Sequence, residues 1–262
     1  MNTVEISSWQ LAMAYTLLLV PLGIMLWYGV DLVGRTILSA VRMTAQLVFV
    51  GLYLQVIFEL NNVWLNIAWL VVMICVADVS ILRGCNLTLR RFWLPLFASL
   101  VIGTAVPLLL FLGLLLRTDP FMDAQYAVPI GGMILGNCLR ADIIGLKSFY
   151  QTIRTREKAF LYALAQGARL HEAVRPFASD ALHSALAPTV ATMATIGLVS
   201  LPGMMTGVIL GGADPVTAIK YQIAIMIAIF SGTAITLVFA IRMTMRTSFT
   251  GYGLLDKEIF IR

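Results

Sequence analysis

Charged and polar residues inside long hydrophobic segments are the first candidates for chemistry in this sequence. Arg42 and Gln46 are four residues apart, so they share one face of a helix. Asp78 lies near the end of the next hydrophobic segment, at a depth that permits an Arg42–Asp78 ion pair. Charges in an apolar environment are costly unless they are paired or hydrated, which makes these residues candidates for a functional site. A purely structural ion pair, or an arginine that reaches back to water, explains the same pattern.

A second polar cluster, Asn137, Arg140 and Asp142, interrupts a later hydrophobic segment. Because Arg140 and Asp142 are two residues apart, they point to different faces of a helix and each needs its own partner.

Methionines form a third group. Thioethers are ligands for soft ions such as Cu(I), but methionine also fills gaps in helical cores. Core filling explains the group better, and we predict no metal site. The residues concerned are Met133, Met193, Met204, Met205 and Met226.

The elements that carry these residues are membrane-spanning helices. The chain has 262 residues, of which 60% are hydrophobic and 12% are charged, so a soluble core of this size could not bury its apolar surface. The net charge of +5 is concentrated between apolar segments, which indicates cytoplasmic loops and not nucleic-acid binding.

Seven hydrophobic segments are long enough to span a bilayer, which takes about 20 residues. Basic residues gather in alternate connections, which predicts an external N-terminus and a cytoplasmic C-terminus. The seven expected spans are residues 9–29, 37–59, 64–82, 92–116, 128–146, 189–210 and 218–241.

The longest polar interruption runs from Lys147 to Pro188 and is rich in Arg and Lys. From Leu170 its apolar residues recur at steps of three and four, which predicts an amphipathic helix at the membrane surface. Gly167-Ala168 predicts a helix end and a turn before it. Pro176 predicts either a kink or the first turn of a second helix. A linker helix lying on the surface accounts for the pattern equally well.

Motifs for several activities are missing from the sequence. There is no Gly-x-x-x-x-Gly-Lys-[Ser/Thr] loop, so any nucleotide energy must come from another polypeptide. The two histidines, His171 and His183, both lie in the polar stretch, which excludes a histidine-based site inside the membrane. No Gly-x-Ser-x-Gly or His-Glu-x-x-His motif occurs, so an enzyme is the least favoured class.

Three blocks together resemble the Fet-type iron-export ABC transporter permease family, which is related to plant aluminium-tolerance half-transporters. Arg42-Met-Thr-Ala-Gln-Leu47 is similar to that family as well. The resemblance covers roughly Arg42 to Arg242. The blocks are residues 128–137, the Gly167-Ala168 helix leading to Leu186-Ala-Pro188-Thr, and residues 199–207 followed by 214–222.

The resemblance implies a permease without an ATP site, working as a pair of half-transporters with two copies of a separate ATPase that binds ATP and Mg. Family members export iron in bacteria, while plant relatives are tied to aluminium tolerance and a nucleotide sugar, so the substrate does not follow from membership. Many ABC permeases carry an acidic residue before the Gly of a cytoplasmic Gly-Ala pair. Tyr162 occupies that position here.

We therefore predict an all-α, polytopic membrane permease with one domain over residues 1–262 and a cytoplasmic coupling region at 147–188. It would be a homodimer in the bacterial inner membrane, bound to a cytoplasmic ABC ATPase, with no cofactor in this chain and no nucleic-acid partner. A secondary transporter or channel is the alternative. The predicted coupling residues are Tyr162, Gly167, Ala168, Arg169, Glu172 and Arg175, and the predicted translocation path contains Arg42, Gln46, Asp78, Asn137, Arg140, Asp142, Met204 and Met205.

Overall fold

The structure is a computed structural model that describes residues 7–117, 119, 121–249, 253–256 and 259. All named elements in this part of the chain are helices, which confirms the predicted all-α fold. The chain forms two compact units. The first contains Met1–Leu60 and Leu210–Gly212, and the second contains Asn61–Ile209 and Ala213–Arg262. The expectation of a single permease domain stays a prediction.

The first unit is a pair of apolar helical stretches. One consists of α1 (Ser8–Ala14), the 3-10 helix η1 (Tyr15–Leu18) and α2 (Leu19–Trp27), and the other is α3 (Val33–Leu60). The Tyr15 hydroxyl and the Thr44 hydroxyl share a hydrogen bond that ties the two stretches together. Most of the described side chains in this unit are exposed, as expected for helices whose apolar surface faces lipid.

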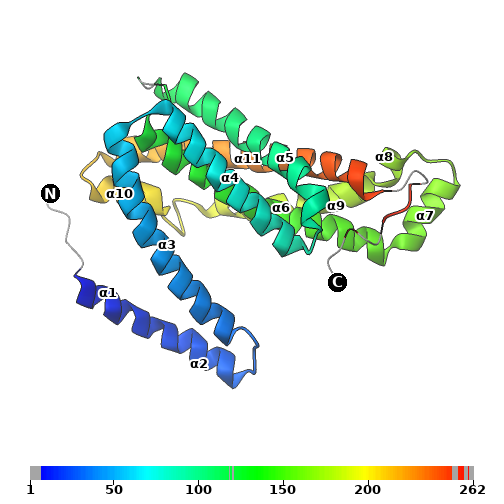
Figure 1. Cartoon of the computed structure of the whole chain (residues 1–262), viewed down its shortest axis with the longest axis horizontal. Helices are drawn as coiled ribbons and strands as arrows, with labels where there is room; N and C mark the ends of the chain where they lie inside the picture. Colours follow the sequence, from blue (N-terminus) through cyan, green and yellow to red (C-terminus); the bar gives the residue numbers. More distant parts are fainter. Residues whose placement is uncertain (1–6, 118, 120, 250–252, 257–258, 260–262) are drawn as a thin grey trace. The chain divides into compact units, whose positions relative to one another are not determined.

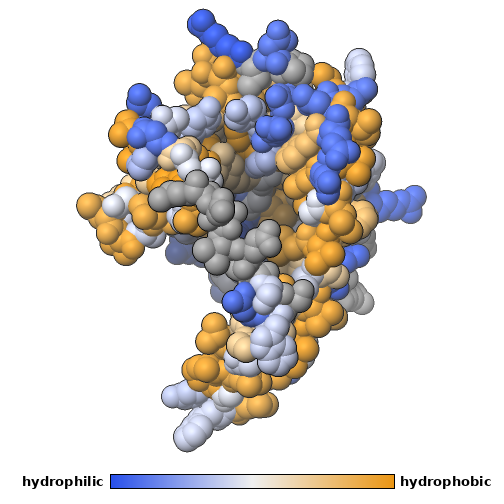
Figure 2. Space-filling view, turned by 90° about the vertical axis from the view of Figure 1, so that its left-hand side faces the viewer, coloured by the Kyte–Doolittle hydropathy of each residue, from blue (hydrophilic) through white to orange (hydrophobic). Residues whose placement is uncertain are grey.

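The second unit is a bundle of long helices around α6 (Figure 1). Its long members are α4 (Val63–Cys85), α5 (Leu89–Leu110), α6 (Ala124–Thr155), α9 (Arg175–Thr195) and α11 (Pro215–Ser248). Helix α6 contacts each of the other four, and it carries the largest set of buried side chains in the bundle. Hydrophobic residues also cover much of the outer surface seen in Figure 2, which is the expected pattern for a molecule solvated by lipid.

Contacts between helices fix their directions. Leu70 packs against Gly131 and Ile143 against Gly84, so α4 and α6 run in the same direction. Asp142 contacts Thr236 and Tyr150 contacts Ser248, so α6 and α11 also run in the same direction. The chain between α6 and α11 must therefore return to the end of the bundle where α6 begins. This return is made by α9 and α10 (Gly203–Leu210).

Six helical stretches are long and apolar enough to span a membrane. They match six of the seven expected spans, each shifted by a few residues at its ends. The expected span at 189–210 is not one continuous helix. It comprises the end of α9, a non-helical segment at 196–202 and α10. The direction of α11 agrees with a crossing here, while the number of crossings stays a prediction.

Proline residues account for two local features of these helices. Helix α5 contains Pro95 and Pro107, and the π-helical segment η2 (Phe111–Leu116) follows it and ends at Arg117. The break after α9 ends at Pro202, whose ring cannot continue a helix from the preceding turn.

Candidate functional site

The polar stretch folds into short helices at one end of the second unit (Figure 1). Helix α7 (Glu157–Ala165) ends just before Gly167, which has a φ of +91° and makes the predicted turn. Helix α8 (Leu170–Ala173) has only four residues, and α9 begins at Arg175 with Pro176 in its first turn. The amphipathic stretch is therefore two helices, and Pro176 begins the second because its missing N–H is harmless there.

Aromatic packing holds this block against the rest of the bundle. The Phe160 side chain on α7 is 1% exposed. Its ring meets the Phe177 ring edge to face, with centroids 6.1 Å apart, and the Phe249 ring at 5.8 Å. Val174 is also buried. We call the segment from Glu157 to Phe177 the cytoplasmic block, after the side of the membrane that the sequence predicts for it, and buried aromatic contacts join its helices to each other and to Phe249.

The predicted coupling residues lie on this block, most of them on its surface. The Tyr162 side chain is 66% exposed, and Arg169, Glu172 and Arg175 are exposed as well. Ala168 is half-buried and packs against the core. One carboxylate oxygen of Glu172 accepts a hydrogen bond from the Arg169 backbone N–H at 2.8 Å. Glu172 thus closes the first turn of α8.

Among the predicted path residues, Asp142 occupies the most enclosed position. It is 0% exposed, and its Oδ2 accepts a hydrogen bond from the Thr236 hydroxyl of α11 at 3.0 Å. Its Oδ1 has no hydrogen-bond partner. Arg140 is exposed on the other side of α6, as the two-residue separation predicts. Asn137 is half-buried and donates to the Met133 carbonyl at 2.8 Å within the same helix.

The contact between Asp142 and Thr236 depends on a close approach of α5 and α11. A Cβ atom added to Gly103 would lie 2.5 Å from the Thr236 Cβ, and one added to Gly232 would lie 2.8 Å from the Gly103 carbonyl oxygen. The Tyr150 and Ser248 hydroxyls hydrogen bond at 2.7 Å further along α6 and α11. Sequence reasoning missed Gly103, Gly232 and Thr236, because single glycines and threonines in apolar helices carry no pattern.

The glycines that are spaced four apart in the sequence, Gly132 with Gly136 and Gly203 with Gly207, behave differently. Gly132 packs against the Met73 methyl group. Within 4 Å of a Cβ placed on Gly136, Gly203 or Gly207 the structure has no other atom. These three glycines therefore do not serve close helix packing inside the described part of this chain.

Asp78 is the second buried carboxyl group of the predicted path. It is 1% exposed on α4, and its Oδ1 has no hydrogen-bond partner. Arg42 and Gln46 are exposed on α3, which belongs to the first unit. Because the two units are described separately, the Arg42–Asp78 pair stays a prediction.

Met204 and Met205 are half-buried on α10, and Met204 packs against the bundle core. In the part of the chain that the structure describes, no three His, Cys, Asp or Glu side chains are grouped as metal ligands would be.

The segment between α9 and α10 exposes both backbone and apolar side chains. Gly197 has a φ of +86°, and its N–H donates to the Ser200 carbonyl at 2.9 Å. Leu198 and Val199 are 90% and 82% exposed. Non-helical backbone at membrane depth is tolerated only where protein or water satisfies it. The predicted crossing at 189–210 would therefore place this break next to a partner or an aqueous path.

Comparisons with known proteins find related membrane proteins. The model of an uncharacterised protein family, UPF0014, matches residues 8–249. The probable iron export permease protein FetB of Escherichia coli is 30% identical over 94% of this chain and 93% of its own length. Protein ALUMINUM SENSITIVE 3 of Arabidopsis thaliana is 30% identical over 94% of this chain and 90% of its own. The UPF0014 membrane protein YjkA of Bacillus subtilis is 29% identical over 82% and 84%. No solved structure gives a significant match.

Proposed function

The chain belongs to the UPF0014 family and is a membrane permease, and from this we propose that it is the permease subunit of an ABC transporter. A separate cytoplasmic subunit would bind ATP and Mg, because this sequence has no phosphate-binding loop. The complex, and not this chain alone, would hydrolyse ATP.

The proposed cargo is iron or a related metal or small solute, moved out of the cytoplasm. Support comes from the name of FetB, an iron export permease, and from the aluminium sensitivity named for the plant relative. The proposed site is the bacterial inner membrane, with the N-terminus outside and the C-terminus in the cytoplasm, which agrees with the distribution of basic residues.

The observation that carries the ATPase proposal is the packing of the cytoplasmic block. A soluble motor can move membrane helices only through an element that transmits force without bending. The buried ring of Phe160 on α7 contacts the ring of Phe177 in the first turn of α9. Helix α9 in turn packs directly on α6 and α11. Tyr162 and Arg169 stand exposed on its surface, available to a partner. A flexible surface linker would not need such a buried aromatic anchor.

Two copies of this chain would form the transport unit. Gly136, Gly203 and Gly207 offer open small-residue faces, which permit close approach of helices from another subunit. The exposed backbone between α9 and α10 would then be covered by the partner or line the path. Asn137 and Arg140, on the less buried side of α6, would supply polar groups of that path, whereas Asp78 and Asp142 lie buried inside the bundle.

Charge reversal on the cytoplasmic block tests this proposal. In Arg169→Glu, co-purification with the ATPase and substrate-stimulated ATP hydrolysis should fall by roughly tenfold or more, because a reversed charge repels the group that Arg169 would meet across the interface. Tyr162→Ala should weaken both as well, because it removes an exposed aromatic contact. Insertion of the permease and its dimerisation should be unchanged. Lys220→Glu is the matched control, since Lys220 is exposed on α11 near the predicted external end.

A bulky residue at Ala168 is a second test, but its effect would have two causes. It is half-buried, so a bulky residue there would disturb core packing as well as a partner surface. Arg169→Glu avoids that problem. If it forms a complex with wild-type activity, the block is a surface linker and the ATPase assignment fails.

The buried carboxyl groups favour a second candidate function. An ion-coupled carrier commonly holds acidic residues inside the membrane, and Asp78 and Asp142 each have an oxygen without a partner. Transport by the purified chain alone in vesicles with an ion gradient and no ATPase would establish the carrier. Strict dependence on the ATPase and ATP would exclude it.

A further inference from the structure

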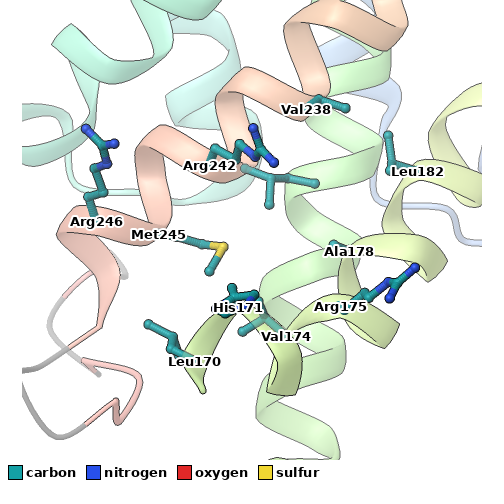
Figure 3. A pocket seen from close by; sticks show the side chains of 11 residues that line it. Leu170, His171, Val174, Arg175, Ala178, Leu182, Val238, Arg242, Met245 and Arg246 are labelled. Carbon is teal, nitrogen blue, oxygen red and sulfur yellow. The ribbon is translucent and has the colours of Figure 1, made fainter. Parts of the chain in front are cut away.

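A groove lies between the start of the α8–α9 segment and the end of α11, and of its lining residues only Arg175 belongs to the predicted ATPase contact. Its volume is about 660 Å³, and it lies wholly within the second unit (Figure 3). One wall is formed by α8 and α9 and the other by the final turns of α11. The lining includes His171, Arg175, Arg242 and Arg246.

The groove combines basic and apolar side chains, and along α11 Val238 lies at one end, Arg246 at the other and Arg242 between them (Figure 3). Helices α9 and α11 run in opposite directions, so residues early in α9 face residues late in α11. Leu182 and Val238 lie at one end, whereas His171 and Met245 lie towards the other (Figure 3). Over the roughly 12 Å from residue 238 to residue 246, the wall formed by α11 changes from an aliphatic surface to arginines.

The positive charge has no acidic counterpart in the groove. No Asp or Glu is among the lining residues. Among the residues that the structure describes, the recorded salt bridges are Arg91–Asp256 and Arg156–Asp180, and neither involves a groove residue. An anion of the surroundings would therefore lower the electrostatic energy of the groove.

From this charge and shape we infer that the groove binds an anionic phospholipid of the cytoplasmic leaflet. The phosphate would lie between Arg242, Arg246 and His171, and an acyl chain would follow Val238 and Leu182 toward the hydrocarbon core. The predicted topology places the arginine end at the cytoplasmic surface, where anionic headgroups and basic pockets between helices meet. A free anion would not use the apolar end. The inference rests on the topology of the chain and not on the ATPase partner.

Native mass spectrometry of the purified full chain tests the inference. In detergent, the protein should retain phosphatidylglycerol in preference to phosphatidylcholine of the same chain length. Removal of charge in Arg242→Gln and Arg246→Gln should weaken phosphatidylglycerol binding by about fivefold for each arginine. Arg90→Gln is the matched control, because Arg90 is an exposed arginine at the predicted cytoplasmic side that does not line the groove.

Two further arms separate the possible occupants. Val238→Trp fills the apolar end and should weaken both lipids, while soluble glycerol phosphate at the same concentration should not compete. Competition by glycerol phosphate would identify a free-phosphate site and overturn the lipid inference. Equal retention of phosphatidylglycerol and phosphatidylcholine by the wild-type protein would also overturn the inference, and this measurement requires no variant. Unchanged phosphatidylglycerol binding in Arg242→Gln/Arg246→Gln, with loss of ATPase co-purification, would assign the groove to the protein partner instead.

Discussion

Replacing Gly103 by alanine should separate α5 from α11 and release the Thr236–Asp142 hydrogen bond. The new Cβ would lie 2.5 Å from the Thr236 Cβ and 3.0 Å from the Thr236 backbone N and Cα atoms. Ordinary carbon contacts are about 3.5–4.0 Å, so the helices must move apart by about 1 Å. A rotamer change cannot relieve the overlap, because two of the three atoms belong to the backbone.

The size of the effect follows from three contributions. Overpacking in a well-packed core costs about 1–3 kcal/mol. The hydrogen bond from Thr236 to Asp142 is 3.0 Å long, and a 1 Å displacement would take it beyond bonding range. Leaving a buried carboxyl group without that partner costs about 1–3 kcal/mol more. Alanine regains up to about 1 kcal/mol of helix propensity. The free energy of unfolding should therefore fall by about 1–5 kcal/mol.

Unfolding of the purified chain by SDS in mixed micelles, followed by circular dichroism, measures this change. Gly23→Ala is the matched control, because Gly23 lies inside α2 with no other atom within 4 Å of its added Cβ. The control should be neutral or stabilising by up to about 1 kcal/mol. Wild-type stability of Gly103→Ala, or an equal loss in both variants, would refute the close approach of α5 and α11.

Two further predictions concern the buried carboxyl group and the topology. Thr236→Val keeps the side-chain shape but removes the hydroxyl group that donates to Asp142, so the free energy of unfolding should fall by about 1–3 kcal/mol. Thr236→Ser keeps the hydroxyl group and should stay close to wild type. Equal losses of stability in the two variants, measured in the same SDS assay, would show that the hydroxyl group does not matter. A reporter fused after Arg246 should be cytoplasmic, and one inserted at Asn61-Asn62 or near Thr118 should be external. An external C-terminus would overturn the seven-span arrangement.

The sequence alone determined the class of fold and most of the helices. Apolar segments of about 20 residues can cross a bilayer only as helices, because a lipid environment forces each segment to satisfy its own backbone hydrogen bonds. Composition and length therefore place α3, α4, α5, α6 and α11 without knowledge of their neighbours. Local chemistry also placed the turn at Gly167, because it depends on the backbone preference of a single residue, whereas at Pro176 it left a kink and a new helix as alternatives.

Tertiary structure decided the break in the expected span at 189–210. In the sequence, this segment is hydrophobic along its whole length. Only the folded chain shows that α9 ends at Thr195 and α10 begins at Gly203. For the predicted path residues, too, the sequence determines one property and the tertiary structure another. Depth along a helix follows from the sequence, but the face of α6 that carries Asp142 is buried only because α11 packs there.

The partners of the buried groups also came from tertiary structure alone. Thr236 meets Asp142 across 94 positions of sequence, and at the same residue α11 passes so close to α5 that a Cβ on residue 103 would overlap Thr236. Arg242 and Arg246 come to face the α8–α9 segment by the same kind of long-range packing. Hydropathy and spacing report on one helix at a time, whereas contacts between helices depend on shape complementarity between segments far apart in the chain.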